Sequence, residues 1–258
     1  MQYETITYSE TNGLGVITLN RPEVMNALST QMRAELTHAV KEAGKTARAL
    51  VLTGAGRAFC SGQDLGDQAK VANIDLERTL RDEYEPLLRA IYDSPIPTVS
   101  AVNGPAAGAG ANLALAADVV IASQSASFIQ AFTRIGLIPD AGGTYWLPRQ
   151  IGAARAMGAA LFADKIGADQ AAAWGMIYEA IPDADFAAHW QARAAHLANG
   201  PTAAYKAVKT AIRASHGNTL DQQLTLEAQL QGACGQTHDF KEGVIAFLEK
   251  RPPQFEGR

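Results

Sequence analysis

The stretch VNGPAAGAGANLALAAD at residues 102–118 constrains the fold of this chain more than any other segment. An apolar run leads into it, glycines separated by proline and alanines follow, and a helical pattern then begins. This order indicates a strand, a tight loop and a helix. Such a loop leaves backbone N–H groups free at the positive end of the helix dipole. The segment predicts either a site for an oxygen that becomes anionic or a strand-to-helix turn packed with small residues.

Several classes of partner are excluded by motif and composition. The loop is neither GxGxxG with a downstream acid nor GxxxxGKS/T, so we expect no dinucleotide and no nucleoside triphosphate. The net charge is −4 without a basic run, which argues against nucleic acid. No apolar run approaches the roughly 18 residues of a membrane helix. The histidines show no metal-ligand spacing, and the 2 cysteines form no CxxC pair, so we expect no metal and a cytoplasmic location.

Strand-like and helix-like segments alternate along most of the chain. Residues 3–8 alternate like a strand, and with residues 15–19 they predict an opening hairpin. Short apolar runs typical of strands occur at residues 49–52, 97–102 and 119–122. Helical spacing occurs between the strands, first at residues 29–42 behind an N-cap at Ser29, and then at residues 76–92. This alternation predicts an α/β fold with a parallel sheet. Later residues are rich in alanine and helical, so we expect an α/β core over residues 1–195 and a helical C-terminal region over residues 196–258.

Three glycine-containing loops follow strand-like segments, at residues 57–65, 104–110 and 139–144. Loops at the carboxyl ends of parallel strands converge, so these three are expected to lie together. In the first loop, the N–H of Gln63 directly follows Gly62 and is a second candidate donor. Two such donors aimed at one oxygen form an oxyanion hole, worth about 3–4 kcal/mol for each donor. The alternative is a turn in which Asp64 caps a short helix.

Asp140 in the third loop is the candidate general base. Its neighbours are apolar, and partial burial would raise its pKa and strengthen it as a base. The alternative is an ordinary helix N-cap, a position that Asp favours. Phe132, a short distance upstream, lines either a pocket or the core. Cys60 is either a nucleophile or a structural residue, and its apolar neighbours favour the second interpretation.

Several blocks of the sequence together resemble the crotonase superfamily of enoyl-CoA hydratases and isomerases. They are LNRPEVMNALS at 19–29, LTGAGRAFCSGQDL at 52–65, the opening stretch, FTRIGLIPDAGGTYWLPR at 132–149, WGMIYEAI at 174–181 and the C-terminal FKEGVIAFLEKRPPQF. The resemblance covers nearly the whole chain. It implies a ββα spiral core with a helical C-terminal trimerisation region, assembled as a trimer or a dimer of trimers. It also implies an acyl-CoA thioester substrate, with no cofactor beyond the coenzyme A that the substrate carries.

The resemblance also implies roles for individual residues. The backbone N–H groups of Gln63 and Ala109 match the donors of the family's oxyanion hole. A second group falls where the family lines the adenine and pantetheine path, namely Ala58, Phe59, Cys60, Ser61, Asp64 and Leu65. Phe247 and Lys250 fall where a neighbouring subunit reaches the coenzyme A.

The chain departs from the hydratase pattern at two positions. Hydratases carry two glutamates that activate water, and their positions here are Asn112 and Phe132. The resemblance therefore implies an isomerase that uses Asp140 as its base, with Phe132 as an apolar wall. It is greatest to the branch that converts 1,2-epoxyphenylacetyl-CoA into oxepin-CoA.

Three alternatives to the ring-epoxide reaction stay open. The first is a Δ3-Δ2 enoyl-CoA or dienoyl-CoA isomerase, which would use the same base. The second is a hydratase or thioester hydrolase, with Glu83 or Glu85 positioning water. The third is a non-catalytic acyl-CoA-binding protein.

Overall fold

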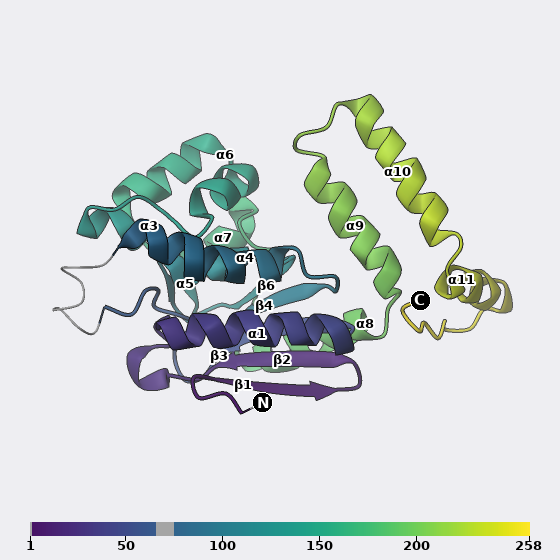
Figure 1. Ribbon diagram of the computed structural model, residues 1–258, viewed down its shortest axis with the longest axis horizontal. Helices are drawn as coiled ribbons and strands as arrows, with labels where there is room; N and C mark the ends of the chain where they lie inside the picture. Colours follow the sequence, from purple (N-terminus) through teal and green to yellow (C-terminus); the bar gives the residue numbers. More distant parts are fainter. Residues whose placement is uncertain (1, 66–74) are drawn as a thin grey trace.

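The computed structural model describes residues 2–65 and 75–258, and the larger of its sheets has six strands in the order β1-β2-β3-β4-β6-β9 (Figure 1). The strands are β1 (Ile6–Thr11), β2 (Leu14–Leu19), β3 (Ala49–Gly54), β4 (Thr98–Val102), β6 (Val119–Ser123) and β9 (Glu179–Ile181). β1 and β2 form an antiparallel hairpin, and every later neighbour is parallel. The predicted hairpin and buried parallel strands are therefore confirmed, whereas β9 was not predicted.

A second sheet of three very short strands lies at the loops. It contains β5 (Ala106–Ala107), β7 (Ser127–Ile129) and β8 (Ile166–Gly167). The isolated bridge between Cys60 and Ala106 connects the loop after β3 to this sheet. The sequence analysis assigned no strand to β5 or β8, because two residues are too few to show a period.

Helix α1 (Thr30–Thr46) begins where the sequence predicted. The hydroxyl of Ser29 accepts a hydrogen bond from the N–H of Met32 at 3.2 Å, so the predicted N-cap is confirmed. The predicted helix over residues 76–92 is also present, but it is not uniform. It consists of α3 (Leu76–Thr79), a π-helical segment at Leu80–Tyr84 and α4 (Glu85–Tyr92).

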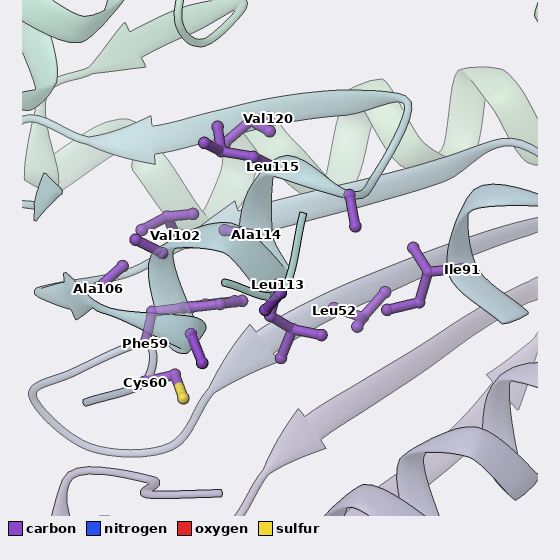
Figure 2. Packing of buried hydrophobic residues seen from close by; sticks show 14 of the residues in the cluster. Leu52, Phe59, Cys60, Ile91, Val102, Ala106, Leu113, Ala114, Leu115 and Val120 are labelled. Atoms are coloured by element: carbon purple, nitrogen blue, oxygen red, sulfur yellow. The ribbon is translucent and has the colours of Figure 1, made fainter. Parts of the chain in front are cut away.

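Helix α5 (Ala109–Leu115) is buried along its entire length. Figure 2 shows Leu113, Ala114 and Leu115 of this helix packed among Val102, Val120 and Phe59. A helix that is apolar on all sides is stable only inside a core. Its first residue is therefore held in place by packing on every face.

The remaining helices follow the sheet in sequence. They are α6 (Gly143–Phe162), with non-helical backbone at Gly152, α7 (Ala168–Trp174), α8 (Asp183–Ala198), α9 (Thr202–Ala214), α10 (Leu220–Cys234) and α11 (His238–Glu249). α8 packs Phe186 and Ala194 against Ile121 of the sheet. None of the helices in the described ranges has the length and apolar character needed to cross a bilayer.

Helices α9, α10 and α11 stand to one side of the core (Figure 1). Ion pairs from Lys209 and Arg213 to Asp118, at 2.8 and 2.5 Å, fasten α9 to the core. The three helices leave large apolar side chains exposed, at Val208, Ile212, Leu220, Leu224, Phe240, Val244, Ile245, Phe247 and Leu248. This arm therefore carries apolar surface that its own chain does not cover.

Candidate active site

Two backbone N–H groups, those of Gln63 and Ala109, form the candidate oxyanion hole. Each follows a glycine with a positive φ, Gly62 at 95° and Gly108 at 53°, which is a conformation that favours glycine. Neither N–H donates a hydrogen bond within the described part of the chain. A Cβ atom added to Gly62 would lie 3.5 Å from the nitrogen of Ala109, so the two loops are in contact. The structure thus brings the two predicted donors together.

A parallel bridge to Leu28 holds the Gln63 peptide. The N–H of Leu28 donates to the carbonyl of Gly62 at 2.8 Å, and the N–H of Asp64 donates to the carbonyl of Leu28 at 3.3 Å. These bonds use the groups on either side of Gln63 and leave its own N–H free. Asp64 makes an ion pair with Arg21 at 2.7 Å, and the short helix that it would cap in the alternative interpretation lies outside the described residues.

The side chain of Gln63 is fixed as well as its backbone. Its Oε1 accepts hydrogen bonds from the hydroxyl of Tyr84 at 2.6 Å and from Nη1 of Arg33 at 3.0 Å. Arg33 is 2% exposed, forms an ion pair with Glu83 and donates to the carbonyl of Leu28 at 2.6 Å. One buried guanidinium therefore contacts both the loop of the hole and the π-helical segment.

Gln63→Ala is expected to destabilise the protein and to lower kcat/KM, although this side chain does not face the substrate oxygen as a donor. In the structure the change leaves the hydroxyl of Tyr84 and an N–H of Arg33 unpaired, at a cost of about 1–3 kcal/mol. Urea unfolding and steady-state kinetics measure both effects. Gln63→Glu, which keeps the acceptor, should restore most of the stability, and a fully stable Gln63→Ala would contradict the proposed bracing.

Asp140 lines a cavity of about 550 Å³. Most of the side chains around it are apolar or aromatic, and they include Leu80, Tyr84, Leu88, Tyr92, Tyr145 and Trp146. Burial raises the pKa of Asp140 from its ordinary value of 3.8 to about 6. Its Oδ1 is buried and has no hydrogen-bond partner among the described residues. A carboxylate in this state is a strengthened base with one oxygen unoccupied.

The N-cap alternative for Asp140 is wrong. Helix α6 has its cap at Gly142, and no side chain makes a capping hydrogen bond there. Asp140 contributes its backbone carbonyl instead, which accepts from the N–H of Gly143 at 2.8 Å. The carboxyl group is therefore not engaged in starting the helix.

The residues predicted to line the coenzyme A path divide into two groups. The side chains of Ala58, Phe59 and Cys60 are buried, at 2%, 0% and 0% exposure, and the latter two belong to the core in Figure 2. Any contact that these three residues make with a ligand must therefore come from their backbone atoms, and their place on the coenzyme A path stays a prediction. Burial also raises the pKa of the Cys60 thiol to about 12, which argues against a nucleophile.

The other predicted contacts lie nearer the surface. Ser61 and Asp64 are half-buried, and Leu65 is exposed. Phe132 is buried against Gly108 and is not among the residues that line the cavity. Phe247 and Lys250 are exposed on and just after α11, at the opposite end of the molecule from α3 (Figure 1). Neither residue is among those that line the cavity at Asp140 of their own chain.

The sequence analysis missed the cavity wall formed by α3, the π-helical segment and α4. Leu80, Tyr84, Leu88 and Tyr92 follow one another at intervals of four residues and all line the cavity. Leu87 and Ile91, between them, face the core. The four-residue spacing of these cavity-lining side chains, beside the core-facing ones, was the sequence signal that could have predicted the cavity wall.

Comparison with known proteins identifies the family of this chain. The sequence pattern of the enoyl-CoA hydratase/isomerase family matches residues 9–258. A Rhodobacter capsulatus protein named probable enoyl-CoA hydratase is 68% identical over 258 residues, covering 100% of both chains. The 1,2-epoxyphenylacetyl-CoA isomerase of Escherichia coli is 47% identical over 95% of this chain and 96% of its own.

A solved structure extends the likeness to the fold. The enoyl-CoA hydratase of Bacillus anthracis superposes with a TM-score of 0.91 at 32% identity, covering 99% of this chain and 100% of that one. The chain therefore belongs to the enoyl-CoA hydratase/isomerase family, and it has the crotonase fold that the sequence resemblance implied.

Proposed function

We propose that this protein is an acyl-CoA isomerase in which Asp140 transfers a proton between two carbons of the acyl group. The observation that carries this proposal is the half-buried Asp140 in an apolar cavity, whose buried Oδ1 has no partner among the described residues and whose pKa is about 6. The positions where hydratases carry glutamates hold Asn112 and Phe132, which cannot activate water as carboxylates do. A single base with access to two carbons is sufficient for a double-bond shift.

The reaction balances with the residues of the site. The Asp140 carboxylate removes a proton from the carbon next to the thioester carbonyl, and the electron pair of the C–H bond moves onto the thioester oxygen. The N–H groups of Gln63 and Ala109 stabilise this enolate by hydrogen bonding to its oxygen. The protonated Asp140 then returns the proton to a different carbon as the electron pair moves back. No cofactor takes part beyond the coenzyme A carried by the substrate.

The proposed substrate is 1,2-epoxyphenylacetyl-CoA of phenylacetate degradation. The carbon–carbon bond of its epoxide breaks as the ring double bonds shift, which expands the ring to an oxepin. Asp140 then moves a proton from the carbon next to the thioester to a ring carbon, which gives oxepin-CoA. Two observations support this substrate. The cavity wall includes Tyr84, Tyr92, Tyr145 and Trp146, whose flat faces suit a ring rather than a narrow chain. The relative from Escherichia coli bears the name of this activity.

Hydration is the second candidate, because the relative from Rhodobacter capsulatus is named a probable hydratase. The carboxylates that could hold water here are Glu83 and Glu85. Glu83 is committed to an ion pair with the buried Arg33, so it is poorly placed to hold water. Glu85 lines the cavity and is the carboxylate left for this role.

Turnover of three substrates separates these activities. We expect the epoxide CoA ester and a Δ3-enoyl-CoA to be isomerised, and crotonyl-CoA to be hydrated no faster by the natural protein than by its Asp140→Asn variant. Chromatography of the CoA products measures all three reactions. Rapid hydration of crotonyl-CoA that survives Asp140→Asn would favour the hydratase and overturn the proposal.

We further propose assembly as a trimer or a dimer of trimers. The exposed apolar side chains of α9–α11 support contact with other copies of the chain. The position of Phe247 and Lys250, remote from their own cavity, supports their predicted contact with the coenzyme A of a neighbouring subunit. The cytoplasmic location expected from the sequence stays a prediction.

A further inference from the structure

Asn112 is a fully buried side chain whose amide is bonded at both ends. Its Nδ2 donates to the backbone carbonyl of Asp140 at 2.7 Å. Its Oδ1 accepts from Nε2 of Gln130 at 2.9 Å, and Gln130 is itself 1% exposed. Asn112 lies on α5, one turn after the donor Ala109. One short chain of bonds therefore links the start of the buried helix to the peptide of the candidate base.

The space around this amide is closed. A Cβ atom added to Gly143 would lie 2.4 Å from Nδ2 of Asn112, so only glycine allows the contact. The same Gly143 donates its N–H to the carbonyl of Asp140 at 2.8 Å. The Asp140 carbonyl thus receives two hydrogen bonds from different elements, while its carboxyl Oδ1 receives none within the described residues.

We propose that Asn112 is a positioning residue for Asp140, fixing the main chain of the base relative to the oxyanion hole without contacting its carboxyl group. This inference rests on the proposed function, in which Asp140 is the base. A direct hydrogen bond to the carboxylate would stabilise its charged form and make it a weaker base. Holding the residue by its carbonyl fixes its place without adding a hydrogen bond to the carboxyl group, and it keeps the surroundings of that carboxyl closed.

The first test compares Asn112→Ala and Asn112→Leu, where leucine fills most of the volume but cannot donate. Both variants are expected to lose about 10- to 100-fold in kcat, because a base displaced by a fraction of an ångström meets its carbon poorly. KM should change far less, since the nucleotide end of the substrate binds elsewhere. A 10- to 100-fold rise in KM with kcat unchanged would overturn the inference.

The second readout is the pH dependence of kcat/KM. The groups that line the cavity with Asp140 and titrate or carry charge are Tyr84, Tyr92, Tyr145, Arg81, Glu85 and Arg89. Burial holds the pKa of the Asp140 carboxyl at about 6, and Asn112→Ala is expected to admit water beside it. The midpoint of the acid limb of the pH profile should therefore fall by roughly 0.5–1 pH unit. An unmoved acid limb together with natural kcat would contradict the inference.

The matched control is Asn103→Ala. The amide of Asn103 also bonds at both ends, accepting from the N–H of Gly54 at 3.1 Å and donating to the carbonyl of Gly56 at 3.0 Å. In the described part of the chain its amide makes no hydrogen bond to Asp140, so the acid limb should stay at its natural midpoint whatever the rate. A shift of equal size in this control would show that Asn112 has only a general structural role.

The two levels of proposal fail separately. If Asp140→Asn retains isomerase activity, the proposed function is wrong. If Asp140→Asn is inactive but Asn112→Ala has natural kcat and pH dependence, only the positioning role is wrong. Should the Asn112 variants not fold, Gln130→Leu removes just the outer hydrogen bond, and it should shift kcat and the acid limb in the same directions by less. No change in a folded Gln130→Leu would then overturn the inference.

Discussion

Asp140→Asn is expected to reduce isomerisation of a Δ3-enoyl-CoA by roughly 10²- to 10⁴-fold, the usual contribution of a general base. The amide keeps the shape of the side chain but cannot take a proton. Binding should survive, because the oxyanion hole and the cavity walls are unchanged. Stopped-flow or steady-state turnover measures the loss, and calorimetry with a product CoA ester measures binding. Turnover near the natural rate would show that another group is the base.

The same substitution is expected to stabilise the folded protein at alkaline pH. The pKa of Asp140 is about 6 in the fold and 3.8 in its ordinary state, so the folded protein holds the proton longer as pH rises. The stability gained from this group is therefore complete below about pH 4 and lost as pH rises through about 6. At pH 8 the variant should unfold at a higher temperature than the natural protein, and at pH 4 the two should agree. Lower stability at pH 8 would mean that the carboxylate makes favourable contacts.

Gly62→Ala is expected to lower kcat by about 10²- to 10³-fold, the effect of losing one donor of an oxyanion hole. A Cβ atom at this position would lie 2.7 Å from the carbonyl oxygen of Ala107, so the two loops must move apart. Its φ of 95° adds a backbone cost for any residue with a side chain. Because Gln63 and Ala109 sit on these loops, their N–H groups would no longer converge on one oxygen.

Gly136→Ala is the matched control for this prediction. Gly136 also has a positive φ, 77°, but a Cβ atom there would meet nothing within 4 Å. It therefore bears the backbone cost without the collision, and kcat should stay close to natural. Comparing kcat and the thermal midpoints of both variants separates the two effects. Equal loss of kcat in both would assign the effect to backbone strain and contradict the proposed geometry of the hole.

Much of the fold was predictable because its signals are local. Ser29 caps α1 by a hydrogen bond three residues away, and the apolar run at residues 49–52 needs only its own composition to indicate a buried strand. The strands of the second sheet were not predictable in this way. β5 and β8 each contain two residues, and their existence depends on β7 lying between them.

The candidate site shows the same division between local and distant causes. Gln63 and Asp140 became candidates because each sits beside a glycine turn, and Ala109 became one because the resemblance to the crotonase superfamily implied its role. The bracing of Gln63 was missed, since Arg33 and Tyr84 are remote in sequence and only the fold brings them to its side chain. The burial of the Phe59 and Cys60 side chains was also missed, because a motif gives no information about which side of a loop faces the core.

The two donors of the candidate oxyanion hole come from separate loops, so they meet only after the strands before those loops have paired during folding. Gln63 follows β3 and Ala109 follows β4, and these strands pair in parallel with Leu52 opposite Ser100. Parallel pairing joins distant parts of the chain and forms later than local helical turns. A refolding intermediate with native helices but unpaired β3 and β4 would give a helical signal and no turnover. Enzymatic activity therefore reports the register of the central sheet, which spectroscopic helix content does not.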